Sequence, residues 1–166
     1  MTDRAIVRPT ARVVVLDPEG RVLLLGARLT DPAIPPGDVL FWYTPGGGVE
    51  DGESLRTAAV RELAEEIGLA VAEADLEGPI WLRRHVGAFA GQDYDSRETF
   101  FLLRDVVHEV DPAGRTELEL LGEEPHRWWS VAEVAASIET FAPRDLAARL
   151  SELLAGPWSG PPRIVS

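Results

Sequence analysis

A glycine-rich loop that runs directly into an amphipathic helix is the feature that most constrains the fold of this 166-residue chain. The stretch reads GGGVEDGESLRTAAVRELAEEIGL and extends from Gly46 to Leu69. Within it, apolar residues recur at positions i, i+3, i+4 and i+7, the spacing of one buried helix face: Val60, Leu63, Ala64 and Ile67. The pattern predicts a helix from Ser54 to Ile67 that ends at Gly68.

The same helix carries three glutamates on nearly the opposite face: Glu62, Glu65 and Glu66. Their spacing brings the carboxylates within about one helical turn, where like charges repel by about a few tenths of a kcal/mol per pair. Glycines in the preceding loop let backbone carbonyls approach closely, and carbonyl and carboxylate oxygens are the ligands that Mg²⁺ or Mn²⁺ demands. We therefore predict a divalent-metal site here, with a solvated acidic face as the alternative.

Strands are predicted on both sides of this helix. The runs TARVVVLD and RVLLLGARL flank the turn sequence DPEG and predict a hairpin, and FWYTP predicts a short strand before the glycine loop. GPIWLRRHVGAFA and ETFFLLRDVVHEV predict two paired strands joined by the polar segment GQDYDSR. Strands and helices alternate without a regular βαβ repeat, which favours an α+β fold with a mixed β-sheet sandwiched between helices.

Two further helices are expected in the C-terminal part of the chain. Ser130 followed by Glu133 is the capping-box signature of a short helix. Pro143 stands at the predicted first position of a second helix, and Gly156 lies just past its end. The tail, about residues 157–166, is too rich in proline for a regular element.

Composition excludes several kinds of chemistry. The length is that of one ordinary domain, so we expect a single domain over residues 1–166. The absence of cysteine excludes disulfides, thiolate metal sites and a thiol nucleophile. A net charge of -12 repels nucleic acid and anionic membranes, so we expect neither as a partner, whereas a cation could screen a small anionic substrate. No stretch approaches the roughly 20 apolar residues of a membrane span, and we expect a cytoplasmic protein.

The spacing of the acidic helix matches a known family pattern. From Gly47 the chain reads Gly, five residues, Glu53, seven residues, Arg61-Glu62-Leu63, one residue, Glu65-Glu66, one residue and Gly68-Leu69. This pattern resembles the Nudix box, the loop–helix–loop signature of MutT-like Nudix hydrolases, and every defining position in residues 47–69 is filled. The resemblance implies the Nudix fold, an α/β/α sandwich, over most of the chain as a single Nudix hydrolase domain.

The resemblance also implies roles for individual residues. The positions that the family uses to bind metal correspond to the carbonyl of Gly46 and the carboxylates of Glu62, Glu65 and Glu66. Glu62 also matches a position that serves as general base. Arg61 and Glu53 match positions that hold the loop and the helix together by ion pairing, and we expect them to orient the ligands.

A further acid often completes the metal site or serves as base in this family. The segment GEEPHRWWS lies in the corresponding region, so the resemblance proposes Glu123 or Glu124 for this role. Solvation on the surface is the alternative for both residues. Glu62, Glu123 and Glu124 therefore all remain candidates for the general base.

The activity that the resemblance implies is hydrolysis of a phosphoanhydride bond in a nucleoside diphosphate linked to another moiety. Water would attack phosphorus with the help of Mg²⁺ or Mn²⁺. The substrate would be a small nucleotide, and a nucleoside triphosphate and a sugar nucleotide are equally compatible with the sequence. The alternative function is a ligand sensor on the Nudix fold with weak catalysis, and a homodimer stays open because dimers are common in the family.

Candidate contacts to the rest of the substrate are fewer. Arg83 and Arg84 occupy adjacent strand positions, so at most one of them faces a cleft and could hold a phosphate. A surface ion pair is the alternative. Glu98, at the start of ETFFLL, could reach the edge of the cleft, but we favour a solvent-facing strand position for it. Large aromatic residues either stack on a base or, as we favour, fill the core: Trp42, Tyr43 and Trp81. Histidines show no metal-ligand spacing, and we assign them no catalytic role: His85, His108 and His126.

Overall fold

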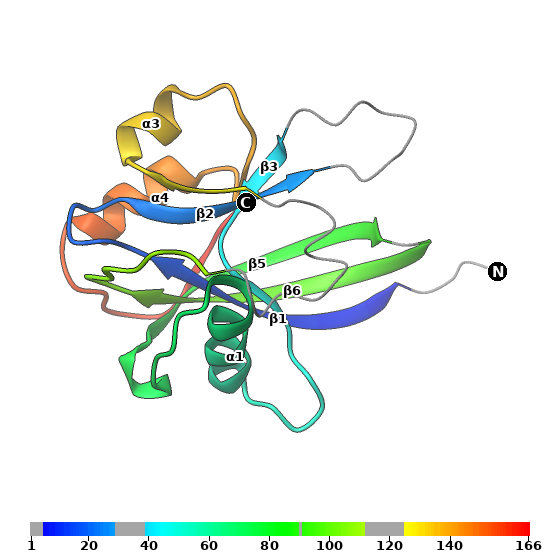
Figure 1. Cartoon of the computed structure of the whole chain (residues 1–166). Coiled ribbons are helices and arrows are strands. Elements are labelled where there is room, and N and C mark those ends of the chain that lie inside the picture. Colours follow the sequence, from blue (N-terminus) through cyan, green and yellow to red (C-terminus); the bar gives the residue numbers. More distant parts are fainter. Residues whose placement is uncertain (1–4, 29–38, 90, 112–124) are drawn as a thin grey trace.

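Two β-sheets form the central layer of the computed structural model, which describes residues 5–28, 39–89, 91–111 and 125–166 (Figure 1). Within these residues, the five-stranded sheet has the order β4 (Gly46–Gly48), β1 (Ile6–Val15), β6 (Gln92–Leu103), β5 (Glu77–Phe89) and β9 (Arg163–Ile164). The four-stranded sheet has the order β7 (His126–Trp129), β2 (Val22–Arg28), β3 (Val39–Tyr43) and β8 (Phe141–Ala142). Both sheets are mixed. β1 pairs with β6 and β3 with β8 in parallel, whereas long pairs such as β5 with β6 are antiparallel.

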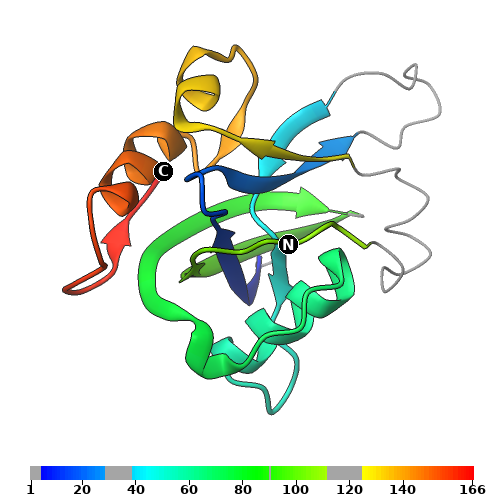
Figure 2. The same ribbon diagram turned by 60° about the vertical axis from the view of Figure 1, so that its left-hand side comes forward.

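Helices cover both faces of this layer. The helices are α1 (Leu55–Ile67), α3 (Val131–Ala136) and α4 (Leu146–Leu154), with a 3₁₀ turn η1 (Glu73–Asp75). In Figures 1 and 2, α1 lies on one side of the strands, and α3 and α4 lie on the other. Alternate residues of β1 serve the two sides, because Val13 packs in the cluster under α1 and Val14 in the cluster under α4. The predicted α+β class, with mixed strands between helices, is confirmed.

The predicted hairpin forms only at its turn. The backbone N–H of Asp17 donates to the carbonyl of Arg21 at 2.9 Å, and the Asp17 carboxylate accepts from the Arg21 N–H at 2.8 Å. Beyond one isolated bridge between Leu16 and Val22, the two strands diverge into different sheets. The prediction of a simple hairpin is wrong because β1 takes its neighbours from β4 and β6, which follow much later in the chain.

The other predicted elements are mostly present, with shifted ends. β5 and β6 pair antiparallel as expected, but β6 already begins at Gln92, so the segment GQDYDSR is strand and not a connection. The predicted capping box of α3 is confirmed. α4 begins at Leu146, three residues later than predicted from Pro143. The proline-rich tail contains the short strand β9, which was not expected. None of the described helices is long and apolar enough to cross a membrane.

Candidate active site

The helix α1 is fixed at both ends by its own sequence. The Ser54 hydroxyl accepts from the backbone N–H of Thr57 at 3.1 Å, which satisfies a free donor of the first turn. At the other end, Gly68 has a φ of 69°, and its N–H donates to the carbonyl of Ala64 at 3.1 Å. A Cβ at Gly68 would also meet Asp111, so glycine suits this position for two reasons. The predicted helix and its end at Gly68 are confirmed, and Ser54 is its N-cap.

The orientation of α1 differs from the prediction. The side that packs on the sheets carries Glu62 and Glu66, which are 8% and 7% exposed, beside Ala59 and Leu63. Ala64, which we placed on the buried face, is exposed, and Val60 is half-buried. Glu62 and Glu66 therefore lie on the same face of α1 as part of its apolar residues. Ala58 and Ala59 are small enough to bring this face close to β1 and β4. Two of the three acids, Glu62 and Glu66, are therefore buried.

Glu62 lies directly against the loop. A Cβ on Gly47 would overlap the Glu62 carboxylate, so only glycine leaves room for this side chain. Burial raises the pKa of the Glu62 carboxyl, and the nearby Glu65 acts in the same direction, although a hydrogen bond from Arg61 opposes both. The conformation of the loop thus holds a partly desolvated carboxylate next to backbone.

Arg61 joins the loop to the helix. Its guanidinium pairs with both carboxylate oxygens of Glu53 at 2.9 Å and also donates to the carbonyl of Gly48 at 2.9 Å. The hydrogen bond from Arg61 and one from the backbone of Glu50 hold the pKa of Glu53 below its ordinary value. The pKa of Arg61 is raised by the same pair, so both groups stay charged. This is the ion pairing that the resemblance implies for the two residues.

The donor set suits a hard divalent cation. The buried carboxylate of Glu62 lies at Gly47, whose missing Cβ leaves space that a side chain would fill, and Glu66 is buried one helical turn further along α1. Within the described ranges, however, no three acidic or histidine side chains stand together as a ready-made site. The Arg61 guanidinium explains why these acids do not form a ready-made site, because it donates to Glu62 at 2.9 Å and to Glu65 at 3.3 Å. The carboxylate and carbonyl oxygens of these residues suit Mg²⁺ or Mn²⁺. Arg61 lies between the candidate ligands Glu62 and Glu65.

The candidates Glu123 and Glu124 lie outside the described residues. The last part of their segment is described, since β7 begins at His126 and pairs with β2. The role of either acid therefore stays a prediction.

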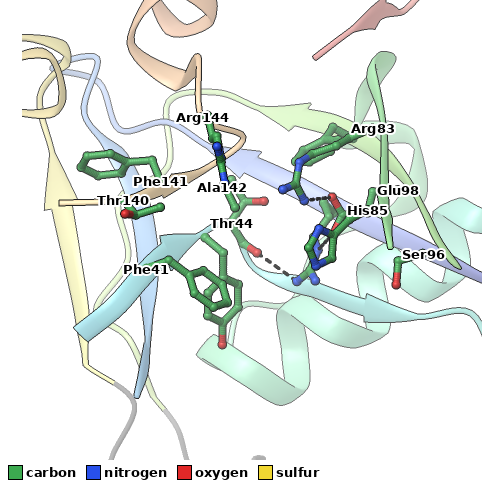
Figure 3. A pocket seen from close by; sticks show the side chains of 13 residues that line it. Phe41, Thr44, Arg83, His85, Ser96, Glu98, Thr140, Phe141, Ala142 and Arg144 are labelled. Atoms are coloured by element: carbon green, nitrogen blue, oxygen red, sulfur yellow. Dashed lines mark hydrogen bonds and ion pairs between the residues drawn. The ribbon is translucent and has the colours of Figure 1, made fainter. Parts of the chain in front are cut away.

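A cavity of about 270 Å³ opens between the two sheets, and we call it the inter-sheet cavity (Figure 3). The five-stranded sheet supplies one apolar residue, Phe100, and five charged or polar ones to it: Arg12, Arg83, His85, Ser96 and Glu98. The rest come from β3, β8 and the residues next to them: Phe41, Tyr43, Thr44, Thr140, Phe141, Ala142 and Arg144. One wall is thus mainly polar, and the facing wall is largely aromatic.

Glu98 organises the polar wall. It is 7% exposed and accepts from Arg83 Nη1 at 2.9 Å and from Arg12 Nε at 3.3 Å. The solvent-facing position that we favoured for Glu98 is therefore wrong. Arg12 continues from this pair to the glycine loop, where its Nη1 donates to the carbonyls of Gly46 at 2.9 Å and of Thr44 at 3.3 Å. Arg12 therefore lies between the inter-sheet cavity and the glycine loop that precedes the acidic helix α1.

Arg83 and Arg84 separate as strand geometry requires. Arg83 lines the inter-sheet cavity, whereas Arg84 is paired with Asp95 at 2.8 Å, is 66% exposed and is absent from the cavity wall. Among the aromatic candidates, Trp42 and Trp81 are core residues and Tyr43 lines the cavity. His85, to which we assigned no catalytic role, also lies on the wall.

Sequence reasoning missed Arg12, Thr44 and Arg144. A signal was present for Arg12, because a single arginine interrupts the apolar run ARVVV of a strand that is otherwise buried. Such a residue needs partners for its charge. Thr44 and Arg144 carry no comparable signal, since each stands in an irregular segment whose path only the tertiary fold determines.

The family model for the NUDIX domain matches residues 7–150. The chain belongs to the Nudix family. It is a Nudix hydrolase, and the match spans residues 47–69, which confirms their resemblance to the Nudix box.

Relatives and solved structures agree with this assignment. An RNA pyrophosphohydrolase of Dinoroseobacter shibae is 44% identical over 146 residues, which cover 81% of this chain and 83% of the relative. An RNA pyrophosphohydrolase of Novosphingobium aromaticivorans is 34% identical over 114 residues, with coverage of 54% and 67%. The MutT protein of Methanosarcina mazei Go1 superposes with a TM-score of 0.63 at 18% identity, covering 92% of this chain and 99% of that one. At this identity the structural likeness shows the fold alone.

Proposed function

We propose that this Nudix enzyme depends on Mg²⁺ or Mn²⁺ and cleaves a phosphoanhydride bond in a nucleotide. The observation that carries the proposal is the burial of Glu62 and Glu66 on α1, with the Glu62 carboxylate held directly against Gly47. Burying two carboxylates side by side is unfavourable unless a cation or hydrogen bonds compensate them. A solvated acidic face would not require this arrangement.

The chain's own residues would share the work as follows. The cation would be held by the Gly46 carbonyl and by the carboxylates of Glu62, Glu65 and Glu66. When bound, it supplies charge for the phosphate oxygens and lowers the pKa of an attacking water. Arg61 and Glu53 keep the loop and the helix in a fixed relation, so that the ligands meet the substrate in one geometry.

A carboxylate must take the proton of the attacking water. Glu62 is one candidate, because Arg61 and Gly47 restrict its orientation. Glu123 and Glu124 are the others and belong to the segment outside the described residues. All three glutamates therefore remain candidates for the general base.

The substrate would extend from the acidic face into the inter-sheet cavity. Arg12 supports this direction, since it lines the cavity and contacts Gly46 at the loop. Nucleoside triphosphates and sugar nucleotides remain candidates. The relatives named RNA pyrophosphohydrolase add the 5′-phosphorylated end of an RNA, although the net charge of -12 led us to expect no nucleic acid partner. The cavity arginines would attract one chain end locally despite the overall charge.

The test is hydrolysis of a substrate panel by the purified protein with Mg²⁺ or Mn²⁺, with products identified by mass. The panel holds nucleoside triphosphates, sugar nucleotides, ADP-ribose, dinucleoside polyphosphates and a short 5′-triphosphorylated RNA. We expect cleavage that needs the metal and is lost in Glu65→Gln/Glu66→Gln. A double variant at exposed sites, Glu19→Gln/Glu139→Gln, changes the net charge equally and should keep full activity.

Three results would contradict the proposal. Absence of metal binding would remove the basis for the acidic face as a metal site. Metal and nucleotide binding without turnover on any compound would favour the ligand-sensor function instead. Hydrolysis that persists in Glu65→Gln/Glu66→Gln would place the chemistry elsewhere in the molecule.

A further inference from the structure

The polar wall of the inter-sheet cavity is rich in hydrogen-bond donors. Three guanidinium groups, of Arg12, Arg83 and Arg144, face a single carboxylate, of Glu98. The hydroxyls of Thr44, Thr140 and Ser96 add further donors. In a chain with a net charge of -12, this cavity is a local concentration of positive charge.

Glu98 does not cancel this character. Its two oxygens already accept from Arg12 and Arg83, and the side chain is only 7% exposed. The carboxylate therefore orients the two arginines and is not free to repel an anion at close range. Arg144 forms no ion pair with any described residue and is exposed at the rim.

Two buried polar atoms of this wall lack a partner within the described part of the chain. The hydroxyl oxygen of Thr44, a residue that is 1% exposed, makes no hydrogen bond. Neither does Arg83 Nε, although Arg83 Nη1 is bonded to Glu98. A buried donor without a partner is unfavourable, so two of them beside one cavity favour a ligand that supplies acceptors to both. The ligand should offer several acceptor oxygens.

The opposite wall limits the shape of that ligand. Phe41 and Tyr43 line the cavity with aromatic rings, which suits a base or a sugar, and Phe141 lines it beside them while packing on Trp129. The volume, about 270 Å³, lies near the lower end for small-molecule pockets, so it admits one ring with one charged substituent. The scissile diphosphate would lie elsewhere, because Ala11 and Arg12 point to opposite faces of β1 and only Ala11 packs toward α1.

We propose that the inter-sheet cavity binds a second phosphate of the substrate, one that lies outside the diphosphate to be cleaved. The proposal rests on the proposed function, whose substrate it specifies. The phosphate is either a monoester on the sugar or the first phosphodiester of a longer chain, and both present the same oxygens to Arg83 and Thr44. Arg12 and Arg144 supply further positive charge that balances the charge of the phosphate.

The first experiment measures binding of inorganic phosphate in EDTA by NMR titration, without any catalytic metal. We expect saturable shifts around the cavity in the wild type and in Glu65→Gln/Glu66→Gln. Arg83→Gln should weaken binding about tenfold or more, since it removes a charged donor to the phosphate oxygens. Arg84→Gln is the matched control, because this neighbouring arginine is absent from the cavity wall and should leave the affinity unchanged.

Thr44→Val is a second variant, which keeps the test valid if Arg83→Gln does not fold. It keeps the shape of the side chain and removes a hydroxyl that has no partner among the described residues, so the fold should be kept while phosphate binding weakens several-fold. Unchanged affinity in both Arg83→Gln and Thr44→Val would overturn the proposal, as would an absence of phosphate shifts. These readouts need no turnover and are separate from the fate of the proposed hydrolase activity.

The second experiment compares kcat/KM for three substrates: a nucleoside triphosphate, its 3′-phosphate, and the corresponding 5′-triphosphorylated dinucleotide. We expect at least a tenfold advantage for one of the last two, reduced in Arg83→Gln and kept in Arg84→Gln. An advantage for the 3′-phosphate assigns the cavity to a sugar monoester, and one for the dinucleotide assigns it to a chain phosphodiester. Equal kcat/KM for all three would overturn the proposal.

Discussion

Gly47 and Glu62 show how one residue at the loop determines the position of a carboxylate. The side chain of Glu62 occupies the space in which a Cβ of residue 47 would stand. Gly47→Ala should therefore displace Glu62 and lower kcat by about 100-fold, the order of effect expected from misplacing a reactive group by about 1 Å. Steady-state hydrolysis with a Mg²⁺ titration measures this. Gly156→Ala, at a position with open space around it, is the control, and an equal loss in both variants would contradict the explanation.

Glu53 acts on the site only through Arg61. Glu53→Gln removes the charge from a pair of 2.9 Å hydrogen bonds that connects the loop to α1. We expect a loss of about 10–100-fold in metal affinity or activity, as is typical when residues that orient metal ligands are changed. The matched control is Glu50→Gln, because Glu50 is 69% exposed and 3.9 Å from the same guanidinium. Equal effects of the two variants on metal affinity, measured by calorimetry, would show that only the net charge matters.

At the residue scale, the sequence predicted the acidic cluster well and its orientation poorly. Spacing alone identifies Glu62 and Glu66 as neighbours on a helix, because this depends only on helical geometry. Whether they face solvent or the sheet depends on which side of α1 packs closely, and Ala59 allows that on the acidic side. Arg12 was missed and Glu98 was placed wrongly for the same reason, since their pairing joins β1 to β6 across most of the chain.

At the scale of elements, local signals predicted helices and long-range pairing determined the strands. The ends of α1 and the capping box of α3 follow from residues within four positions of each other, and both predictions are confirmed. The partners of β1 cannot be derived in this way, because β4 and β6 begin 40 and more residues downstream of its start. The short β9 exists because β5 offers a free edge to the tail.

The capping box of α3 gives a pH-dependent prediction. The hydrogen bond from the Ser130 backbone, opposed in part by burial, holds the pKa of Glu133 below its ordinary value. A carboxyl with a lowered folded pKa stabilises the fold above its unfolded pKa, and this contribution disappears as the pH falls through the folded pKa. In urea unfolding, Glu133→Gln should therefore be less stable than the wild type at neutral pH, and the difference should vanish in acid. A difference that is constant with pH would contradict the charge of Glu133 as the cause.

For the whole molecule, the two covered faces and the net charge act together. The clusters under α1 and α4 both include residues of β1 and β2, so the central strands connect the acidic helix to the rest of the core. A net charge of -12 opposes this compact state by self-repulsion. Cations that bind the folded chain should stabilise all of it, since α1 cannot leave the sheets without exposing one of the two clusters.

Metal binding should accordingly be measurable as global stability. With Mg²⁺ at about 100 times its dissociation constant, the folded state gains about 2.7 kcal/mol, and EDTA should reverse the gain. Thermal unfolding at constant ionic strength, adjusted with NaCl, separates specific binding from screening of the -12 charge. Glu65→Gln/Glu66→Gln should lose most of the shift, whereas Glu19→Gln/Glu139→Gln should keep it. The same Mg²⁺ shift in both double variants would mean that the ion acts on the overall charge and that α1 holds no specific site.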